Sequence, residues 1–408
     1  MAKRVVVLHH PSSFLPLEVF RHVDGSVELI WAVDRSLGED TPPRLLAKLG
    51  TYVDITGMSA GEAAASLARC GPDGLTTFVD SRLRLASELA ERLGLFYHSR
   101  DVAERLVDKR LQRSALAMAG VPGPQFWTVE AGISPTALSD LACRVAYPAV
   151  LKPAEGTAGK GVRLVTGPSE LEQIVRASTD APGYLLETFI TDSSKEPWRS
   201  DELVVESVVT DGHVSHAVIT GRFPLAPPFR QTGSFLPRAL PAGLRRRVLE
   251  VVEQAIEALG VHWALTHTEL KLTPEGPKVI EVNGRLGGIV PFTLARVSRA
   301  NLFQVACRVA CGEGFRFPEL VPCSDVAYWL RVLPPVTATR VGEVKGLGSL
   351  RDLPEVDSAV LHCGPGEPVD WRKGTASVVA TVQGTVSTEA ELPGTMQKIN
   401  ETLDIDYA

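Results

Sequence analysis

The sequence lacks several features that would place it in whole classes of protein. It has no basic run or arm, and its formal net charge of −6 gives a nucleic-acid partner little electrostatic support. No apolar stretch approaches the roughly 18 residues that a membrane-spanning helix requires. Its six cysteines lack the paired spacing of a zinc site or a disulfide framework. We therefore expect a soluble, cytoplasmic protein with reduced thiols and without a nucleic-acid or membrane partner.

The first hundred residues lack a dinucleotide-binding fingerprint, although they alternate between predicted strands and helices. Strands are predicted at Arg4–Leu8, Val27–Val33 and Leu75–Phe78, and amphipathic helices at Pro42–Leu49, Ala60–Arg69 and Leu83–Leu93. Such alternation is typical of a parallel, doubly wound sheet. The first strand is followed by His9 and not by a G-x-G-x-x-G motif. The sequence thus predicts a Rossmann-like layer without its usual cofactor chemistry.

The length of the chain predicts further domains beyond this layer. At 408 residues the chain exceeds the usual size of one hydrophobic core, and 44% hydrophobic with 22% charged residues is ordinary for a packed protein. Later elements predicted from periodicity are helices at Val107–Ala119, Thr136–Cys143 and Gly243–Leu259, strands at Tyr147–Lys152, Val162–Val165, Leu185–Ile190, Leu203–Thr210, Val214–Thr220, Ala264–Leu272 and Lys278–Asn283, and a loop at Phe223–Pro241.

A glycine-rich segment, the flap from Gly156 to Gly161, lies between two of these predicted strands. Its three glycines would let backbone N–H groups turn toward an anion, as phosphate-binding loops do. It is not a Walker A loop, because Gly161 follows Lys160 where that pattern requires Ser or Thr. A plain turn is the alternative interpretation, but Lys152 on the apolar strand just before the flap favours phosphate binding.

Two predicted strands joined by a short turn carry a pair of glutamates. We centre this hairpin on Glu275, so that Leu272 faces Lys278. Glu269 then lies directly opposite Glu281, where two carboxylates repel and destabilise the sheet. A bound Mg²⁺ ion would make the closeness of the two carboxylates favourable, because it prefers carboxylate, carbonyl and phosphate oxygens as ligands. The sequence therefore predicts a magnesium site, with a solvent-facing charged hairpin as the alternative.

The same register extends the polar face beyond the two glutamates. His267 falls opposite Asn283, and the period of two places Asn283 and Arg285 on the face of the glutamates. Val279 and Val282 make the second strand largely apolar, which argues against a solvent-facing hairpin. A slip of one residue would break this constellation, so the prediction depends on the assumed register.

These segments together resemble the ATP-grasp superfamily and, more narrowly, its L-amino-acid (dipeptide) ligase branch. The resemblance covers nearly the full chain, and it is carried by Lys152-Pro with the flap, Leu185-Leu-Glu-Thr-Phe-Ile190, His267-Thr-Glu269 and Glu281-Val-Asn-Gly-Arg-Leu-Gly-Gly288. It implies an α/β fold with α+β lobes and four regions. They are a Rossmann-like N-terminal domain at 1–106, a small lobe with the flap at 107–186, a large lobe with the magnesium and catalytic site at 187–312, and a β-rich C-terminal region at 313–408, expected to pack on the large lobe.

The resemblance also implies ATP and Mg²⁺, with Mn²⁺ as an alternative metal, and a role for each matching residue. The residues implied to bind ATP are Lys109 and Lys152 at the phosphates, Gly156, Thr157, Gly159, Lys160 and Gly161 over the β- and γ-phosphates, and Glu187, Thr188, Phe189 and Ile190 at the adenine. The implied metal ligands are Glu269, Glu281 and Asn283. The implied catalytic residues are Arg285, His267 and Arg222, and the implied substrate-binding residues are Gln231, Gly287 and Gly288.

The activity that the resemblance implies is ATP-dependent joining of a carboxylic acid to the amine of an amino acid or peptide. The acid would be activated as an acyl phosphate, with release of ADP and phosphate. A biotin-carboxylase-like or purine-pathway member of the superfamily, and a nucleotide-binding module without catalysis, are the alternatives; a homodimer is left open. Gln231 departs from the branch, which commonly carries glutamate in this loop, so acyl donors without a free α-amino group are included.

Overall fold

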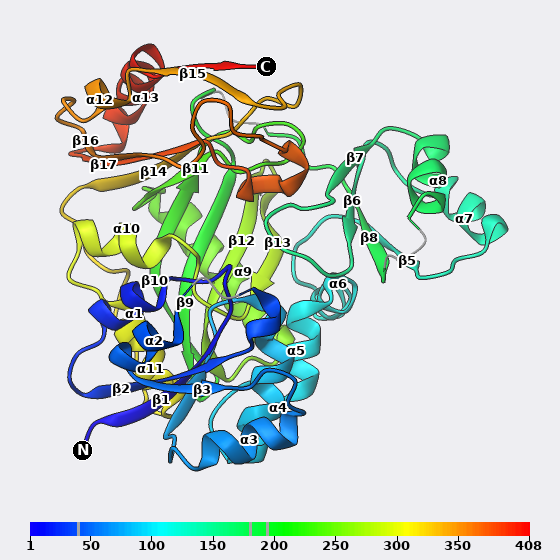
Figure 1. Cartoon of the computed structure of the whole chain (residues 1–408). Coiled ribbons are helices and arrows are strands. Elements are labelled where there is room, and N and C mark those ends of the chain that lie inside the picture. Colours follow the sequence, from blue (N-terminus) through cyan, green and yellow to red (C-terminus); the bar gives the residue numbers. More distant parts are fainter. Residues whose placement is uncertain (39–40, 179–181, 193–195) are drawn as a thin grey trace.

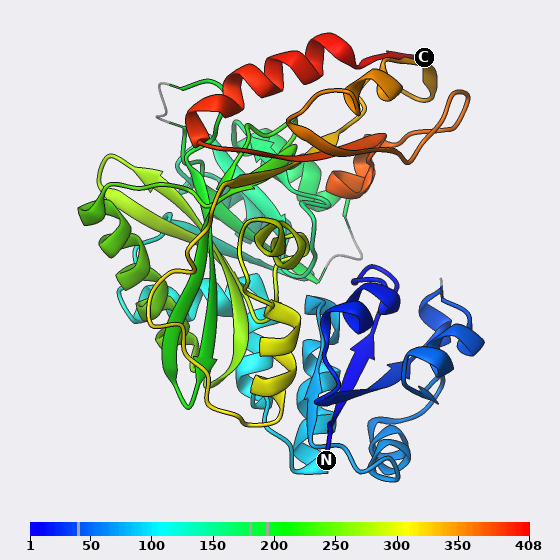
Figure 2. The ribbon, with the colours of Figure 1, turned by 90° about the vertical axis from the view of Figure 1, so that its left-hand side faces the viewer.

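The N-terminal part of the chain is a parallel sheet with helices beside it, as its strand–helix alternation predicts (Figure 1, Figure 2). The computed structural model describes residues 1–38, 41–178, 182–192 and 196–408. The sheet has the order β3-β2-β1-β4, and its strand β3 is too short for the sequence pattern to predict. The elements are β1 (Lys3–His9), α1 (Pro16–His22), β2 (Val27–Val33), η1 (Arg35–Leu37), α2 (Pro43–Leu49), β3 (Thr51–Asp54), α3 (Ala60–Ala68), β4 (Gly74–Thr76), η2 (Asp80–Arg82) and α4 (Leu83–Leu93).

Two helices follow, of which the sequence pattern predicts only the second, at 107–119. They are α5 (Arg100–Val107) and α6 (Lys109–Met118). The Asp108 carboxylate accepts hydrogen bonds from two N–H groups in the first turn of α6, at 2.8 and 3.4 Å, and this capping starts a new helix. The predicted start, Val107, is the last residue of α5, so the prediction omits the rest of that helix. The break places Lys109 in the first turn of α6.

The small lobe is an antiparallel sheet of order β5-β8-β6-β7 with two helices (Figure 1). Leu151 and Leu186 of the sheet share a buried cluster with Leu138 and Leu171 of the helices. The flap connects β6 to β7, as predicted, and the strand expected at Leu185–Ile190 begins and ends two residues earlier. The elements are β5 (Phe126–Glu130), α7 (Pro135–Ala142), β6 (Ala149–Pro153), β7 (Arg163–Val165), α8 (Pro168–Arg176) and β8 (Gly183–Thr188).

The large lobe and the C-terminal region share one sheet, of order β13-β12-β9-β10-β11-β14-β17-β16 (Figure 1). Strand β11 lies inside the predicted loop at Phe223–Pro241, and it pairs with the C-terminal strand β14. The C-terminal region therefore extends the sheet of the large lobe by backbone hydrogen bonds. The elements are β9 (Glu202–Thr210), β10 (His213–Arg222), β11 (Gly233–Leu236), α9 (Ala242–Leu259), β12 (Trp263–Thr273), β13 (Gly276–Asn283), α10 (Val290–Val297), α11 (Leu302–Ala310), β14 (Val326–Val332), β15 (Val341–Lys345), α12 (Leu347–Leu350), β16 (Val356–Leu361), η3 (Trp371–Ala376), β17 (Ala380–Val386), η4 (Glu389–Glu391), α13 (Leu392–Thr402) and β18 (Asp404–Tyr407).

The N-terminal sheet is apolar on both faces, and one of them packs against the large lobe. In β1, Val5 and Val7 join a buried cluster with Phe303 of α11, whereas Val6 and Leu8 join a second cluster with helices α3 and α4. Near-continuous apolar strands are typical of a parallel sheet that is covered on both faces. This packing positions the end of β4 beside the large lobe, where a functional side chain, Asp80, follows it.

Helices α5 and α6 pack their apolar side chains on the large lobe, while charged residues of α6 contact the small lobe. Leu106 and Leu116 share a buried cluster with Val252 of α9 and Val282 of β13. The domain boundaries at 106, 186 and 312 stay predictions, since α6 precedes the small lobe in the chain and contacts the large lobe in space. The six cysteines carry free thiols. Within the described residues, no helix combines the length and the apolar character needed to cross a membrane.

Candidate active site

The register of the β12–β13 hairpin differs from the predicted one beside the turn. Leu272 pairs with Pro277, so its predicted pairing with Lys278 is wrong by one residue. The turn is one residue tighter than a hairpin centred on Glu275. Continued along the strands without correction, this shift would move one glutamate to the opposite face of the sheet.

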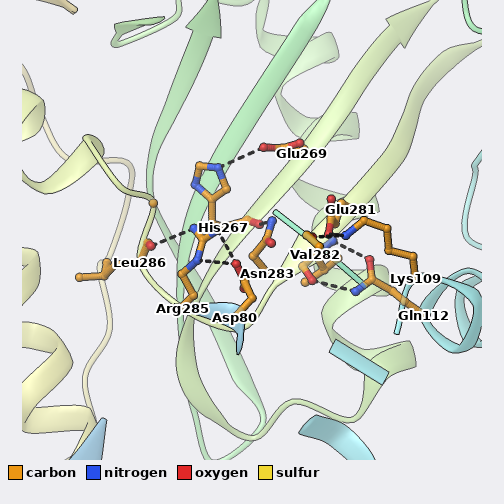
Figure 3. Close-up of polar contacts among 12 residues, drawn as sticks. Asp80, Lys109, Gln112, His267, Glu269, Glu281, Val282, Asn283, Arg285 and Leu286 are labelled. Carbon is orange, nitrogen blue, oxygen red and sulfur yellow. Dashed lines mark hydrogen bonds and ion pairs between the residues drawn. The ribbon is translucent and has the colours of Figure 1, made fainter. Parts of the chain in front are cut away.

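A β-bulge at Ile280 restores the predicted pairing at the functional end of the hairpin. Ile280 is the extra residue between the two paired stretches, because a bulge sets two residues of one strand against one of the other. Beyond it, Glu269 pairs with Glu281 and His267 pairs with Asn283, as predicted. Figure 3 shows the glutamates on neighbouring strands. The acidic pair therefore rests on a bulge that the sequence pattern does not reveal.

The site is a cavity of about 610 Å³ between the two lobes, with the flap and the hairpin on its walls. Its lining includes most of the residues that the sequence predicts for ATP, metal and substrate. They are Lys109, Lys152, Gly156, Thr157, Gly159, Lys160, Glu187, Thr188, Phe189, Ile190, Gln231, Glu269, Glu281, Asn283 and Arg285. The predicted site residues outside this lining are Gly161, Arg222, His267, Gly287 and Gly288.

Lys109 links the hairpin to the flap. Its Nζ lies 2.6 Å from Glu281 Oε1 and 2.9 Å from the carbonyl oxygen of Gly156 (Figure 3). Gln112, one turn along α6, holds the helix on β13 through two hydrogen bonds of 2.8 Å to the backbone of Val282. Burial opposes the charge on Lys109, but Glu281 outweighs it and raises the pKa of the lysine. Lys109 therefore stays cationic beside the predicted metal ligand.

Glu187 is the buried centre of a second charged group. Its two carboxylate oxygens lie 2.6 Å from Arg113 Nε and 2.5 Å from Lys152 Nζ. Burial favours the neutral acid, but Lys152 and Arg113 hold the pKa of Glu187 below its usual range. The Glu187 carboxylate, predicted at the adenine, thus holds Lys152, the lysine predicted at the phosphates. Sequence reasoning missed Arg113, although it lies four residues from Lys109 and so shares its helix face.

Glu269 is surrounded by cationic groups on the sheet. Its Oε1 lies 3.4 Å from Arg222 Nη2 and 3.5 Å from His267 Nε2, and His267 Nδ1 contacts the buried carboxylate of Glu206. Burial opposes protonation of His267, but Glu206 outweighs it and raises the histidine pKa. Burial also favours neutral Glu269, yet His267 and Arg222 hold its pKa far below the usual range.

His267 lies between two carboxylates, those of Glu206 and Glu269. Glu206 binds its Nδ1 side and also accepts a hydrogen bond of 3.2 Å from the N–H of Gly287. A side chain at Gly287 would meet both His267 and Glu206, which explains the glycine. Sequence reasoning missed Glu206; its signal is a carboxylate inside the otherwise apolar strand β9.

Arg285 is held by Asp80 of the N-terminal domain. Its Nη2 and Nε lie 2.7 and 3.0 Å from Asp80 Oδ2, and its Nη1 donates to the carbonyl of Leu286 at 3.0 Å (Figure 3). Asp80 therefore orients the guanidinium of Arg285. Sequence reasoning missed Asp80, although it follows the carboxyl end of strand β4, where parallel sheets usually place functional groups.

The predicted metal ligands fit a magnesium ion that shares its coordination with phosphate. Glu269 and Glu281 are opposed in the sheet, and Asn283 engages His267 O through its amide nitrogen at 3.3 Å rather than through its oxygen. Within the described residues, no three His, Cys, Asp or Glu side chains gather as a metal site. Mg²⁺ commonly takes one or two carboxylates together with substrate phosphates, so two glutamates suffice.

A second cavity, of about 770 Å³, begins at Ile289, directly after Gly288. On neighbouring strands Arg222 pairs with Ser234, Ser234 with Trp329, and Trp329 with Gln383, so these residues form one row across the sheet. Both Trp329 and Gln383 line this cavity, as do charged and aromatic side chains from the N-terminal domain and α10. Gly287 and Gly288 thus lie between the predicted metal site and a second, separate space.

Comparison with known proteins agrees with this arrangement. A family model described as an ATP-grasp domain matches residues 145–292. The chain is 26% identical over 343 residues to the uncharacterized protein y4rH of Sinorhizobium fredii, a match that covers 81% of this chain and 67% of that protein. It is 25% identical over 273 residues to the alanine–anticapsin ligase of Bacillus subtilis, covering 61% of this chain and 56% of that protein.

The fold is shared with a solved enzyme. The crystal structure of the L-amino acid ligase from Bacillus licheniformis matches with a TM-score of 0.78 and 21% identity, over 100% of this chain and 99% of that chain. The chain spans between about half and two thirds of the length of the two curated relatives. The domain match identifies residues 145–292 as an ATP-grasp domain, and the fold of the whole chain is similar to that of an L-amino acid ligase.

Proposed function

We propose that this protein is an ATP-dependent ligase that joins a carboxylic acid to the amine of an amino acid or peptide. The observation that carries the proposal is one cavity that combines two lysines, Lys109 and Lys152, with the opposed carboxylates of Glu269 and Glu281. Lysines suit phosphate oxygens, and paired carboxylates suit magnesium. Their combination supports binding of a magnesium nucleotide. The likeness to the L-amino-acid ligase branch supports amide formation as the reaction.

Different residues of the cavity would bind different parts of ATP. Lys109 and Lys152 are placed to meet phosphate oxygens, and the flap can offer its backbone N–H groups to the β- and γ-phosphates. Glu269, Glu281 and Asn283 would hold Mg²⁺, which when bound neutralises charge on the transferring phosphoryl oxygens. Phe189 and the backbone beside it would face the adenine.

The chemistry that this arrangement supports proceeds through an activated acid. A carboxylate is a poor electrophile, so the γ-phosphoryl group of ATP moves to its oxygen and gives an acyl phosphate and ADP. The amine then attacks the acyl carbon, and inorganic phosphate leaves as the amide forms. Arg285 would stabilise the oxyanion of that step, since Asp80 already orients its guanidinium. The closed flap would exclude water, which otherwise hydrolyses the acyl phosphate.

The second cavity, beside Ile289, is our proposed site for one organic substrate. Ile289, which lines this cavity, follows Gly288 in the chain, and the resemblance implies that Gly288 lies beside the acyl group. The volume of the cavity is within the range of small-molecule pockets. Gln231 lines the first cavity, where a neutral amide cannot form an ion pair with a substrate amino group. We therefore expect Gln231→Glu to shift preference toward acids with a free α-amino group. An unchanged acid profile would remove Gln231 from substrate selection.

The test of the proposal is phosphate release screened over pairs of acids and amines, with mass spectrometry of the products. Guanidino acids and other acids without an α-amino group belong among the acyl donors because of Gln231. We expect ADP and phosphate release that depends on both an acid and an amine, with an amide product. Turnover that requires bicarbonate and a biotinylated partner, or bicarbonate with a purine precursor, would instead support the carboxylase-like alternatives. Tight ATP binding without turnover on any pair would support a non-catalytic module.

A further inference from the structure

The flap is held by a turn of the C-terminal region that the sequence pattern assigns no role. The N–H of Thr375, in η3, donates a hydrogen bond of 3.1 Å to the carbonyl oxygen of Ala158 at the tip of the flap. Thr375 also lines the nucleotide cavity, and its Oγ1 accepts a hydrogen bond of 3.3 Å from the N–H of Gln231. One threonine thus joins the flap to the loop before β11.

Gly374 allows this close approach. Its φ of 66° lies in the left-handed region, and an added Cβ would stand 2.6 Å from the carbonyl oxygen of Ala158. Two residues with side chains adopt left-handed backbone at the same junction, Ala158 with φ of 58° and Phe229 with φ of 120°. Strained backbone of this kind persists where the surrounding structure imposes it, and such positions cluster at ligand clamps.

Among the described residues, the other hydrogen bond that holds the flap is the one of 2.9 Å from Lys109 Nζ to the carbonyl oxygen of Gly156. Residues 156–161 are exposed, and a side chain at Gly159 would come within 3.1 Å of the carbonyl oxygen of Phe229. Segments with exposed backbone and few buried contacts open at low free-energy cost. The backbone hydrogen bond from Thr375 to Ala158 therefore supplies a large share of the interactions that hold the flap in its position over the cavity.

We propose that Gly374 and Thr375 form a latch that positions the flap over the nucleotide and sets how fast the nucleotide leaves. This inference rests on the proposed nucleotide site, and it assigns to the C-terminal region a part in closing that site. Opening would require the loss of the Thr375–Ala158 hydrogen bond, and closing would restore it. Gly374 and Thr375 are thus positioning residues, which act through the flap rather than on the reacting atoms.

The main test variant is Thr375→Pro. Thr375 has helical backbone angles inside η3, which suit proline, and the substitution replaces the N–H donor by a ring carbon that faces the carbonyl oxygen of Ala158 and so breaks the latch. Thr375→Ala keeps the N–H and removes only the hydroxyl, so it measures the share of the contact to Gln231. Gly374→Val breaks the latch by steric contact with Ala158. Gly366→Val is its matched control, because Gly366 has φ of 84° with nothing within 4 Å of an added Cβ.

The measurement is the dissociation rate of MgADP, followed by stopped flow with ADP that carries a fluorescent N-methylanthraniloyl group. We expect Thr375→Pro and Gly374→Val to speed dissociation about 3- to 10-fold, the range that one hydrogen bond supplies. Gly366→Val should leave the rate unchanged. Equal rates in wild type and both latch variants, with thermal unfolding showing folded protein, would overturn the proposal. So would an equal acceleration in Gly366→Val.

Failure of the latch and failure of the proposed function give different results. The dissociation rate needs no acid or amine, so it tests the latch in a protein that binds MgADP whatever its reaction. If amide formation is observed, the latch variants should also release more phosphate per amide formed, because an open flap admits water to the acyl phosphate. An unchanged ratio together with unchanged dissociation would reject the latch and leave the ligase proposal standing.

Discussion

Replacing Asp80 by asparagine is the sharpest test of how the N-terminal domain serves the active site. Asparagine is nearly the same size as aspartate and keeps an oxygen acceptor, so Asp80→Asn removes the charge and little else. In the protein, Arg285 gives two hydrogen bonds, of 2.7 and 3.0 Å, to one oxygen of Asp80, and the two side chains are only 17% and 10% exposed. The arginine would lose the partner that orients it.

The expected cost follows from this geometry. Hydrogen bonds to charged groups contribute about 1.5–3 kcal/mol each, and the asparagine retains part of one. A loss of about 1.5–3 kcal/mol from the step that Arg285 assists lowers kcat roughly 10- to 100-fold. The KM for ATP should change little, because the lysines and the metal ligands are untouched. The assay is phosphate release with a productive acid and amine pair, measured over a range of ATP concentrations.

A matched control separates catalysis from stability. Asp34→Asn breaks an ion pair of 3.2 Å with Arg82 in the same domain, where the arginine and aspartate side chains are 12% and 21% exposed. Both variants should lose comparable stability in urea unfolding, and only Asp80→Asn should lose turnover. Full kcat in Asp80→Asn, or an equal loss of kcat in Asp34→Asn, would refute the assigned role of Asp80.

Three further perturbations test other parts of the molecule. Glu281→Gln should abolish magnesium-dependent phosphate release in a folded protein, because it removes a predicted metal ligand and the anion that pairs with Lys109. Near-normal turnover at ordinary Mg²⁺ would show that Glu281 is not part of the site. Glu187→Gln leaves Lys152 without its buried partner and should destabilise the fold by about 3–5 kcal/mol in urea unfolding; a change below about 1 kcal/mol would contradict this. Burial lowers the pKa of His98 to about 4 from 6.5, so the unfolded chain binds the proton first and stability should fall by roughly 3 kcal/mol as the pH drops from 6.5 to 4. His98→Asn should flatten that part of the stability profile, and an identical slope would rule out His98 as its source.

Features set by local periodicity could be predicted from the sequence. Strand β2 spans Val27–Val33 in both the prediction and the structure, and helix α4 covers Leu83–Leu93 as its apolar stripe predicts. Both rest on patterns of about ten residues or fewer. The opposed glutamates were also predicted, but the predicted register is wrong at the turn, and the bulge at Ile280 happens to cancel that error. A hairpin's register depends on turn and bulge geometry, which side-chain alternation does not encode.

Partners that lie far apart in the sequence could not be predicted. Asp80 and Arg285 are 205 residues apart, and Glu206 and His267 are 61 apart. Each of these carboxylates comes next to its partner only when the chain folds, so no spacing in the local sequence identifies it. The same holds for Thr375, whose contact with the flap depends on the C-terminal strands joining the sheet of the large lobe. The sequence therefore predicts which residues face a ligand better than which residues hold them.

The ion pairs of the site imply that metal and phosphate bind together. Three of the predicted ligand-binding cations already have a carboxylate partner: Lys109 contacts Glu281, Lys152 contacts Glu187, and Arg285 contacts Asp80. Phosphate alone would draw Lys109 away and leave Glu281 beside a new anion, whereas Mg²⁺ alone would compete with the lysine for the same carboxylate. A magnesium nucleotide satisfies both at once, because its phosphate takes the lysine while its metal takes the glutamate. We therefore expect ATP affinity to fall steeply when Mg²⁺ is withheld from wild type and to depend much less on Mg²⁺ in Glu281→Gln, as titration calorimetry would measure; an equal Mg²⁺ dependence in both proteins would contradict this exchange.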